Sequence, residues 1–312
     1  MSERNQIRIG ARGSLLSRRQ TESVRAWLAA AWPDRPSTGV IIETRGDRTL
    51  DHPLPDIGGK GVFTWELEEA LRAGQIDLAV HSLKDLPTGP APGIVIGAIP
   101  ERLRSSDVLI SRSGATLMEL PADAVIGTSS HRRAAQLRRV RPDLQVQSIR
   151  GNVDSRIRKT KDPAGIYDAS VLATAGLERL GLLGEAAEIL PFDLMLPAPG
   201  QGAIGVQCRD DRDSRALLAV IDDHDARICT SAERAFLAAL GGGCTAPIAC
   251  YGVLTGNRLR LQGRLLALDA SEQIDVVLER EITDESMAIA AGVDLAAAAM
   301  ESGATALLQV IV

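Results

Sequence analysis

The sequence predicts an α/β protein with two sheet-containing domains, followed by a smaller α+β domain. Three observations lead to this prediction. The chain has 312 residues, of which 45% are hydrophobic, so it is long enough to form two or three domains with buried cores. Through most of the chain, short apolar runs typical of strands alternate with segments that have the apolar spacing of helices. After about residue 220 the pattern changes to strands in succession, which favours an antiparallel sheet.

The first alternation begins with the apolar run 6–12, which leads into a helix at 14–32 with one buried face. Ser14 stands where a side-chain oxygen caps such a helix. Gly74 is expected to close a second helix, at 63–74. The other strands expected here are 39–46, 76–85 and 93–100. Because these runs are almost continuously apolar, we expect both faces of the sheet to be covered.

The same alternation starts again after residue 105. Strands are expected at 107–111, 124–130, 145–151 and 168–173, and helices at 131–140 and 152–161. In the last part, a helix at 232–240 precedes strands at 248–255, 258–268 and 274–281, with a turn at "TGN" between the first two. An alanine-rich helix from about 284 to 301 closes the chain.

The charge distribution predicts a small polyanionic ligand. The net charge is -5, yet the stretch from His131 to Lys161 holds ten Lys or Arg residues against Asp143 and Asp154. Part of this cluster is expected to be a solvated helix face, such as the arginines of "QLRRVRP". Proteins that bind single-stranded nucleic acid interleave aromatic side chains for base stacking, and this sequence has none between Trp65 and Tyr167. We therefore expect a small polyanion and no nucleic acid.

Cysteine usage and the N-terminus predict a cytoplasmic protein. The start "MSERNQIRIG" lacks the apolar region of a signal peptide, and no apolar run approaches the roughly 20 residues that span a bilayer. The four cysteines, without paired CxxC spacing, argue against a disulfide framework. Four scattered histidines argue against a structural zinc site. No metal and no membrane contact are expected.

Polar residues gather where the expected strands end. Ligands of open α/β sheets bind outside the carboxyl ends of the strands. The residues at such ends are Arg12, Ser14, Asp47, Lys84, Asp85, Thr128, Ser129, Ser130, Arg132, Arg133 and Arg150. Guanidinium forks match carboxylates, and a helix that opens with Thr-Ser-Ser offers free backbone N–H groups, so the ligand should carry several carboxylates. Asp85, the one acid beside Lys84, is either a functional carboxylate or a plain salt-bridge partner.

The stretch "LGGGCTAPIACYG", residues 240–252, places Cys244 after three consecutive glycines. A free cysteine is most often a buried small hydrophobe, and Gly241 to Gly243 would serve simply to end the preceding helix. The alternative is that the missing side chains let a large group approach the sulfur. A loop between a helix and a strand is a common place for function.

Five segments together resemble the porphobilinogen deaminase family, also called hydroxymethylbilane synthase. They are "GGKGVFTWELEEALRAGQIDLAVHSLKDLPT", "GTSSHRRAAQLRRVRPDLQVQSIRGNVDSRI", "AGLERLGL", "PAPGQGAIGVQCR" and "AERAFLAALGGGCTAPIA". The resemblance covers about the whole chain in the right order. It implies two domains with a type II periplasmic-binding-like α/β fold, at 1–100 with 200–219 and at 105–195. A C-terminal α+β domain with a three-stranded antiparallel sheet, at 222–312, would anchor the cofactor.

The resemblance also implies the chemistry. In this family four porphobilinogen molecules are joined head to tail on a dipyrromethane cofactor, ammonia is lost at each step, and the tetrapyrrole is released by hydrolysis. Each pyrrole carries an acetate and a propionate, which suits the cationic composition. Asp85 matches the catalytic acid of the family, and Cys244 matches the cysteine that holds the cofactor through a thioether. A monomer is expected, with hand-over of the product to uroporphyrinogen III synthase.

The binding residues follow from the same match. The resemblance implies cofactor contacts from Ser14, Asp47, Lys60, Lys84, Asp85, Thr128, Ser129, Ser130, Arg132, Arg133, Arg150 and Gly151. It implies substrate contacts from Arg12, Ser14, Phe63, Arg150, Arg156, Arg179 and Gln201.

The sequence departs from the family pattern in three places. Ser106 occupies a usual arginine position in "ERLRSSDVLI", which puts one substrate or hinge contact in doubt unless Arg104 replaces it. His131 stands where leucine is frequent, and Gly241 where glutamate is common. Two other classes share the two-domain architecture: a small-oxyanion binding protein, which needs no reactive Cys244, and an effector-binding domain, which is normally fused to a DNA-reading helix-turn-helix.

Overall fold

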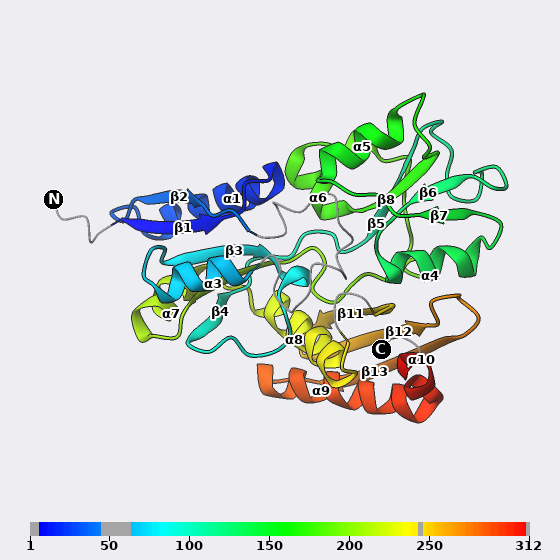
Figure 1. Ribbon diagram of the computed structural model, residues 1–312. Helices are drawn as coiled ribbons and strands as arrows, with labels where there is room; N and C mark the ends of the chain where they lie inside the picture. Colours follow the sequence, from blue (N-terminus) through cyan, green and yellow to red (C-terminus); the bar gives the residue numbers. More distant parts are fainter. Residues whose placement is uncertain (1–5, 45–63, 243–245, 310–312) are drawn as a thin grey trace. The chain divides into compact units, whose positions relative to one another are not determined.

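The computed structural model describes residues 6–44, 64–242 and 246–309, and these divide into two compact units. The first unit comprises Met1–Arg102 with Ala203–Arg227, and the second comprises Leu103–Gly202 with Ile228–Val312. Figure 1 colours the chain along its sequence and shows three separate sheets. One sheet belongs to the first unit and two belong to the second.

The sheet of the first unit has the strand order β2-β1-β3-β10-β4. Its strands are β1 (Ile7–Ala11), β2 (Ser37–Ile41), β3 (Leu78–Ser82), β4 (Ile94–Ala98) and β10 (Ile204–Arg209). Its helices are α1 (Leu15–Ala31), α3 (Trp65–Arg72), α7 (Arg212–Leu218) and the short η3 (Leu83–Asp85) and η5 (Ala219–Ile221). Strands β1, β2 and β3 run parallel to one another, and β10 runs antiparallel to β3 and β4.

Local sequence explains the first helix. The Ser14 hydroxyl accepts the backbone N–H of Ser17 and caps α1, as the sequence predicts. The buried face of α1 presents Val24 and Leu28 to one apolar cluster with Ile9 of β1. Burial of this face stabilises the helix more than its intrinsic propensity does. The core thereby fixes the end of β1, where predicted ligand residues begin.

The first sheet of the second unit repeats this topology, with the order β7-β6-β8-β5-β9. Its strands are β5 (Asp107–Ser111), β6 (Val125–Gly127), β7 (Gln145–Gln147), β8 (Ala169–Ala173) and β9 (Glu188–Ile189). Its helices are α4 (His131–Val140), α5 (Val153–Lys161), α6 (Thr174–Leu180) and η4 (Leu183–Glu185). Here β5 occupies the place that β10 has in the first sheet, and it is antiparallel to both neighbours.

The third sheet is an antiparallel meander in the second unit. It consists of β11 (Ile248–Thr255), β12 (Arg258–Leu266) and β13 (Gln273–Glu281). Helices α8 (His224–Ala239) and α9 (Glu285–Ala299) pack on it through a core that includes Phe236 and Leu295, and α9 continues as η6 (Met300–Ala304) and α10 (Thr305–Gln309). The predicted meander, its turn at "TGN" and the closing helix are therefore confirmed.

One helix of the described chain, Glu285–Leu308, is long and apolar enough to cross a membrane by length and composition alone. Such a helix is weak evidence for a span, because the core helix of a globular domain has the same composition. Ala288, Ala291 and Leu295 on this helix belong to the core beside the third sheet. The apolar composition thus has a role within the fold.

The predicted fold class is confirmed: two mixed α/β sheets with helices, and a small C-terminal α+β part. The structure adds α6, β9, β10 and α7, none of which was predicted from the sequence as a helix or strand. It starts α8 at His224, where the sequence predicts a helix only from 232. It also makes both α/β sheets mixed. The predicted boundaries of three domains stay a prediction. The structure divides into two compact units, and the third sheet lies in the same unit as the sheet that contains β5 to β9.

Candidate functional site

In the first unit, the predicted residues follow two adjacent parallel strands. Arg12 and Ser14 come after β1, and Lys84 and Asp85 form the end of η3, directly after β3. Because β1 and β3 are parallel neighbours, their carboxyl ends meet at one edge of the sheet. Lys84 is half-buried and Asp85 is exposed. The structure therefore brings a carboxylate and two cations to the edge where α/β sheets bind ligands.

Ser17 organises the start of this edge. Its hydroxyl accepts the backbone N–H of Arg12 at 3.0 Å, and its own N–H is donated to the Ser14 hydroxyl at 3.2 Å. The Ser14 oxygen therefore serves as the helix cap, and among the described residues its O–H has no acceptor. A hydroxyl placed in this way can hydrogen-bond a carboxylate.

His81 is a residue at this edge that the sequence reasoning missed. It lies in β3 four positions before Asp85, and its side chain is buried. Burial lowers the pKa of His81 to about 4, with the Gln207 side chain opposing the shift and the positive charge of Arg12 adding to it. Its Nε2 atom has no hydrogen-bond partner among the described residues. The imidazole is therefore neutral at pH 7. Its burial agrees with the covered sheet expected for strand 76–85, but His81 was not among the predicted site residues.

In the second unit, the predicted residues again follow parallel neighbours. Thr128, Ser129 and Ser130 connect β6 to α4, and Arg150 comes shortly after β7. The Ser130 hydroxyl caps α4 by accepting the backbone N–H of Arg133. The Ser129 hydroxyl donates to the carbonyl oxygen of Ile149 at 2.8 Å, so it links the ends of β6 and β7. The result is a capped helix start at a cationic sheet edge, which suits an anionic ligand.

Arg150, Gly151 and Arg156 form the turn that starts α5. Gly151 has a φ of 114°, and a β-carbon there would lie 2.9 Å from Cβ of Ser155, so this position requires glycine. The Arg156 Nε atom donates to the Gly151 carbonyl at 2.8 Å. Both arginine side chains are half-buried. The backbone of the turn therefore fixes the base of the Arg156 guanidinium.

Arg132 and Arg133 lie in the first turn of α4, but their side chains are only 5% and 7% exposed. Both guanidinium groups reach the carboxylate of Asp107, at 2.8 Å and 2.7 Å. Gln201 is also fully buried, and its amide donates to an Asp107 oxygen at 3.0 Å. The sequence predicts these three residues as direct ligand contacts, but in the structure they form a buried network around Asp107. Their contact with a ligand stays a prediction.

Arg179 lies near the end of α6. Its Nη2 atom donates to the carbonyl oxygen of Gly202 at 2.8 Å. Burial lowers the pKa of Arg179 to about 10, so the group remains a cation at pH 7. The neighbouring Glu178 binds Arg104, with 3.1 Å between Nε of Arg104 and Oε1 of Glu178. Arg179 therefore presents a cation that is already fixed by the backbone.

The departure at Ser106 also has a structural correlate. Ser106 is buried, and its hydroxyl lies 2.8 Å from the Thr174 hydroxyl at the start of α6. Arg104, the residue considered as a replacement for the usual arginine, forms its ion pair with Glu178. Position 106 thus serves the packing of α6 in this chain.

Four predicted residues, Asp47, Lys60, Phe63 and Cys244, lie outside the described residues. The described residues that precede Cys244 end α8: Gly242 donates its N–H to the Leu237 carbonyl, and Gly241 donates its N–H to the Ala238 carbonyl. This pair of hydrogen bonds, with a φ of 66° at Gly241, is a Schellman motif that ends α8. Gly241 and Gly242 therefore end α8, which is one of the two roles considered for the glycine run, and the access of a large group to the sulfur stays untested.

The other three cysteines are Cys208, Cys229 and Cys250, and all are buried. Burial raises the pKa of Cys208 to about 11, with the Asp211 charge as the next cause. Because the thiolate is the nucleophile, such a thiol is unreactive at neutral pH. Among the described cysteines, none is placed to react with a large electrophile.

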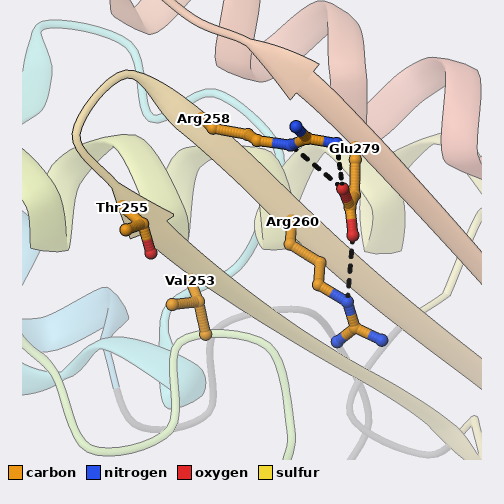
Figure 2. A pocket seen from close by; sticks show the side chains of 5 residues that line it. All are labelled: Val253, Thr255, Arg258, Arg260 and Glu279. Atoms are coloured by element: carbon orange, nitrogen blue, oxygen red, sulfur yellow. Dashed lines mark hydrogen bonds and ion pairs between the residues drawn. The ribbon is translucent and has the colours of Figure 1, made fainter.

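A pocket of about 270 Å³ lies on the third sheet, and its lining includes none of the predicted site residues. Figure 2 shows its lining: Val253 and Thr255 of β11, Arg258 and Arg260 of β12, and Glu279 of β13. Both arginines point toward Glu279, at 2.5 Å and 3.5 Å. These side chains are exposed and satisfy one another, so the pocket carries no chemistry of the predicted kind.

Comparisons with known families match this chain over most of its length. Residues 7–216 match the domain described as "Porphobilinogen deaminase, dipyromethane cofactor binding domain", and residues 227–301 match "Porphobilinogen deaminase, C-terminal domain". Among curated relatives, porphobilinogen deaminase of Roseiflexus sp. (strain RS-1) is 51% identical over 262 residues, which cover 84% of this chain and 86% of the relative. The enzyme of that name from Chlorobaculum tepidum is 42% identical over 306 residues, with 98% and 97% coverage.

Solved structures give more distant matches. Full-length BenM aligns with a TM-score of 0.41 and 16% identity over 70% of this chain and 67% of its own. The periplasmic aliphatic sulphonate binding protein SsuA from Escherichia coli aligns with a TM-score of 0.36 and 16% identity, over 75% and 70%. At these scores the matches add nothing to what the strand topology establishes.

Proposed function

We propose which residues carry the reaction from one premise: the chain belongs to the porphobilinogen deaminase family and contains its dipyrromethane-binding domain. The proposed reaction joins four porphobilinogen molecules head to tail, with loss of one ammonia per condensation, and ends with hydrolytic release of hydroxymethylbilane. The observation that carries the assignment is the exposed carboxylate of Asp85 in η3, directly after β3, at the sheet edge that also holds Arg12 and Lys84.

The described residues fit dipyrromethane by the chemistry of their donors. Two pyrroles with an acetate and a propionate each require cations and hydroxyl groups, and the sheet edges of both units offer them. In the first unit these are Arg12, Ser14 and Lys84, and in the second Thr128, Ser129, Ser130, Arg150 and Gly151. When bound, the cofactor supplies the free pyrrole end to which the first porphobilinogen is joined. Asp47 and Lys60 stay proposed contacts outside the described residues.

Asp85 would act on the substrate through charge and proton transfer. A carboxylate can accept hydrogen bonds from pyrrole N–H groups and stabilise the cation left when ammonia departs from porphobilinogen. It can also take the proton that the receiving pyrrole carbon loses when the new C–C bond forms. Asp85 is exposed. Because η3 directly follows β3, the end of that strand determines where the Asp85 backbone lies. These features support Asp85 as the catalytic residue.

The arginines would hold substrate carboxylates. Arg12 follows β1, Arg150 follows β7 and Arg156 lies in the first turns of α5, and all three side chains are half-buried. Guanidinium suits this task because it stays charged and offers a planar fork. Arg179 and Ser14 would add contacts of the same kind, with Phe63 and Gln201 as further proposed substrate residues. Arg132 and Arg133 would act on the cofactor from their buried positions.

Cys244 would be the covalent attachment point for the cofactor, through a thioether. The burial of Cys208, Cys229 and Cys250 supports this choice, since a reactive thiol must meet a group as large as two pyrroles. The protein would work as a cytoplasmic monomer without nucleic acid or membrane contacts, and pass its product to uroporphyrinogen III synthase. The rival classes, a small-oxyanion binding protein or an effector-binding domain, do not account for the match to the C-terminal domain of the family.

Intact-protein mass spectrometry tests the assignment. The purified parent protein should carry an adduct of two pyrrole units, and Cys244→Ala should lack both adduct and activity. Cys208→Ala, Cys229→Ala and Cys250→Ala are matched controls that should keep the adduct. A parent chain without adduct would contradict the proposed function, and an adduct that survives in Cys244→Ala would contradict the attachment site.

A further inference from the structure

Asp107 joins two arginines that are neighbours in the sequence. It is the first residue of β5 and is fully buried. Its Oδ1 atom accepts hydrogen bonds from Nε and Nη2 of Arg133, at 3.1 Å and 2.7 Å. Its Oδ2 atom lies 2.8 Å from Nη2 of Arg132. One carboxylate therefore engages both guanidinium groups at once.

This shared partner sets the direction of both side chains. Successive residues of an α-helix point about 100° apart around its axis. Arg132 and Arg133, at the start of α4, would therefore diverge if each followed its own rotamer preference. Their common contact with Asp107 on β5 turns both guanidinium groups to one point of the fold. Backbone carbonyls complete the arrangement, because Arg133 donates to Val171 at 3.0 Å.

Gln201 holds the carboxylate from the other side. Its Nε2 atom donates to Oδ1 of Asp107 at 3.0 Å and to the carbonyl oxygen of Ser105 at 2.7 Å. Its Oε1 atom accepts from Nη2 of Arg132 at 3.5 Å. The amide thus contacts the carboxylate and one of the two guanidinium groups, and it links the segment before β10 to α4.

The electrostatics explain why the carboxylate is needed. Burial lowers the pKa of Arg132, the charge of Asp107 opposes this shift, and the charge of Arg133 adds to it. Two guanidinium groups that are each less than a tenth exposed repel one another, since water screens them little. Removal of the negative charge would leave this repulsion at the capped start of α4 without compensation from Asp107.

We propose that Asp107, together with Gln201, is a positioning residue: it orients the side chains of Arg132 and Arg133 toward the carboxylates of the dipyrromethane cofactor. This inference rests on the proposed function. Asp107 itself touches no ligand in this account and acts only through the arginines. Its loss should therefore slow cofactor loading by more than its effect on stability explains.

The test follows loading directly. Apo-protein would be produced in cells that cannot make porphobilinogen and then incubated with porphobilinogen, with the adduct followed against time by intact mass. In Asp107→Asn, loading should slow roughly tenfold or more, since the loss of one hydrogen bond to a charged group changes a rate or an equilibrium by about that factor. Circular dichroism and Tm would report folding and stability of the same samples.

Glu233→Gln is the matched control. Glu233 is an equally buried carboxylate of the same unit, and it accepts the backbone N–H groups of Gly200 and Gly252 at 2.7 Å and 2.8 Å. It should lose a comparable amount of stability and keep near-parental loading. Equal losses of loading in both variants would show that Asp107 acts only on stability, and parental loading in Asp107→Asn would also overturn the inference.

A second variant decides the question if Asp107→Asn does not fold. Gln201→Met keeps every charge and removes the amide that contacts Asp107, Arg132 and the Ser105 carbonyl, so slowed loading in a folded protein is expected. Unchanged loading would overturn the positioning role. A parent chain that never gains an adduct would instead contradict the proposed function, so the two failures are distinguishable.

Discussion

Gly242 packs directly against Ile248, and a β-carbon at Gly242 would lie 2.6 Å from Cδ1 of that isoleucine. The same β-carbon would lie 2.7 Å from Cδ1 of Leu237 in α8. Gly242 thus lets the end of α8 and the start of β11 approach closely, immediately before the segment that contains Cys244. At this position the glycine serves packing.

This packing predicts that Gly242→Ala destabilises the protein. Overpacking of a tight contact costs about 1–3 kcal/mol, so Tm should fall. Gly184→Ala is the control, because a β-carbon there meets nothing within 4 Å. Differential scanning calorimetry of both variants would measure the difference. A Gly242→Ala variant with parental Tm but no adduct would show instead that the glycine serves access to the sulfur.

Asp85→Asn should separate catalysis from binding. The amide keeps the size of the side chain but cannot carry the negative charge or move protons, so turnover should fall by roughly a hundredfold or more. Because Asp85 is exposed, the variant should fold and keep its Tm. Asp85→Glu retains the charge on a longer arm and should keep measurable activity with misplaced geometry.

Product formation by both Asp85 variants would be measured after intact mass has confirmed that each carries the cofactor. An Asp85→Asn protein that loads normally and turns over near the parental rate would make Asp85 a plain salt-bridge partner. The catalytic acid would then have to be another residue.

Arg156 and Arg158 on α5 offer a matched pair. Arg156 is half-buried and fixed to the Gly151 carbonyl, while the Arg158 side chain is 76% exposed and pairs with Asp154 at 3.5 Å on its own helix. Arg156→Leu should raise KM for porphobilinogen roughly tenfold, since a charge-assisted hydrogen bond contributes about 1.5–3 kcal/mol. Arg158→Leu should be mild, because exposed ion pairs contribute about 1 kcal/mol or less.

Steady-state kinetics of the two variants would check this prediction. Equal effects at both positions would mean that α5 supplies only a diffuse positive field. The residue-level assignment of Arg156 would then be wrong.

Most of the strand and helix order was predictable because apolar periodicity is a local property, but α6, α7 and β10 were not predicted. Strand direction was not, because β5 and β10 enter their sheets antiparallel, and this depends on where the chain crosses in space. Strand β9 is only two residues long, too short to show a pattern. The edges that carry Arg12, Asp85 and Arg150 were predictable, since the ends of parallel neighbours meet at one edge.

The burial of Arg132 and Arg133 was not predictable from the chain. Their partner Asp107 is 26 residues from Arg133, and Gln201 is 69 residues from Arg132. A cationic run in a sequence predicts an exposed surface by default. Only the folded structure, in which Asp107 of β5 lies beside the start of α4, shows that these two guanidinium groups have a carboxylate of their own. Arg138 on the same helix remains exposed and donates to the Leu268 carbonyl.

The buried imidazole of His81 predicts a pH dependence of stability. Its pKa is lowered from 6.5 to about 4 in the folded protein, so below pH 6.5 the unfolded chain binds a proton that the folded chain does not. The contribution of the neutral His81 to the free energy of unfolding is therefore fully present above about pH 6.5, and it is lost as the pH falls toward about 4. The whole loss amounts to about 3 kcal/mol, since each pKa unit corresponds to about 1.4 kcal/mol.

Urea unfolding of the parent and of His81→Gln across this pH range would measure the loss. His81→Gln cannot titrate there, so its free energy of unfolding should depend less steeply on pH. His224→Gln, at an exposed histidine of the same unit, should keep the parental pH dependence. Identical slopes for His81→Gln and the parent would mean that other groups cause the acid sensitivity.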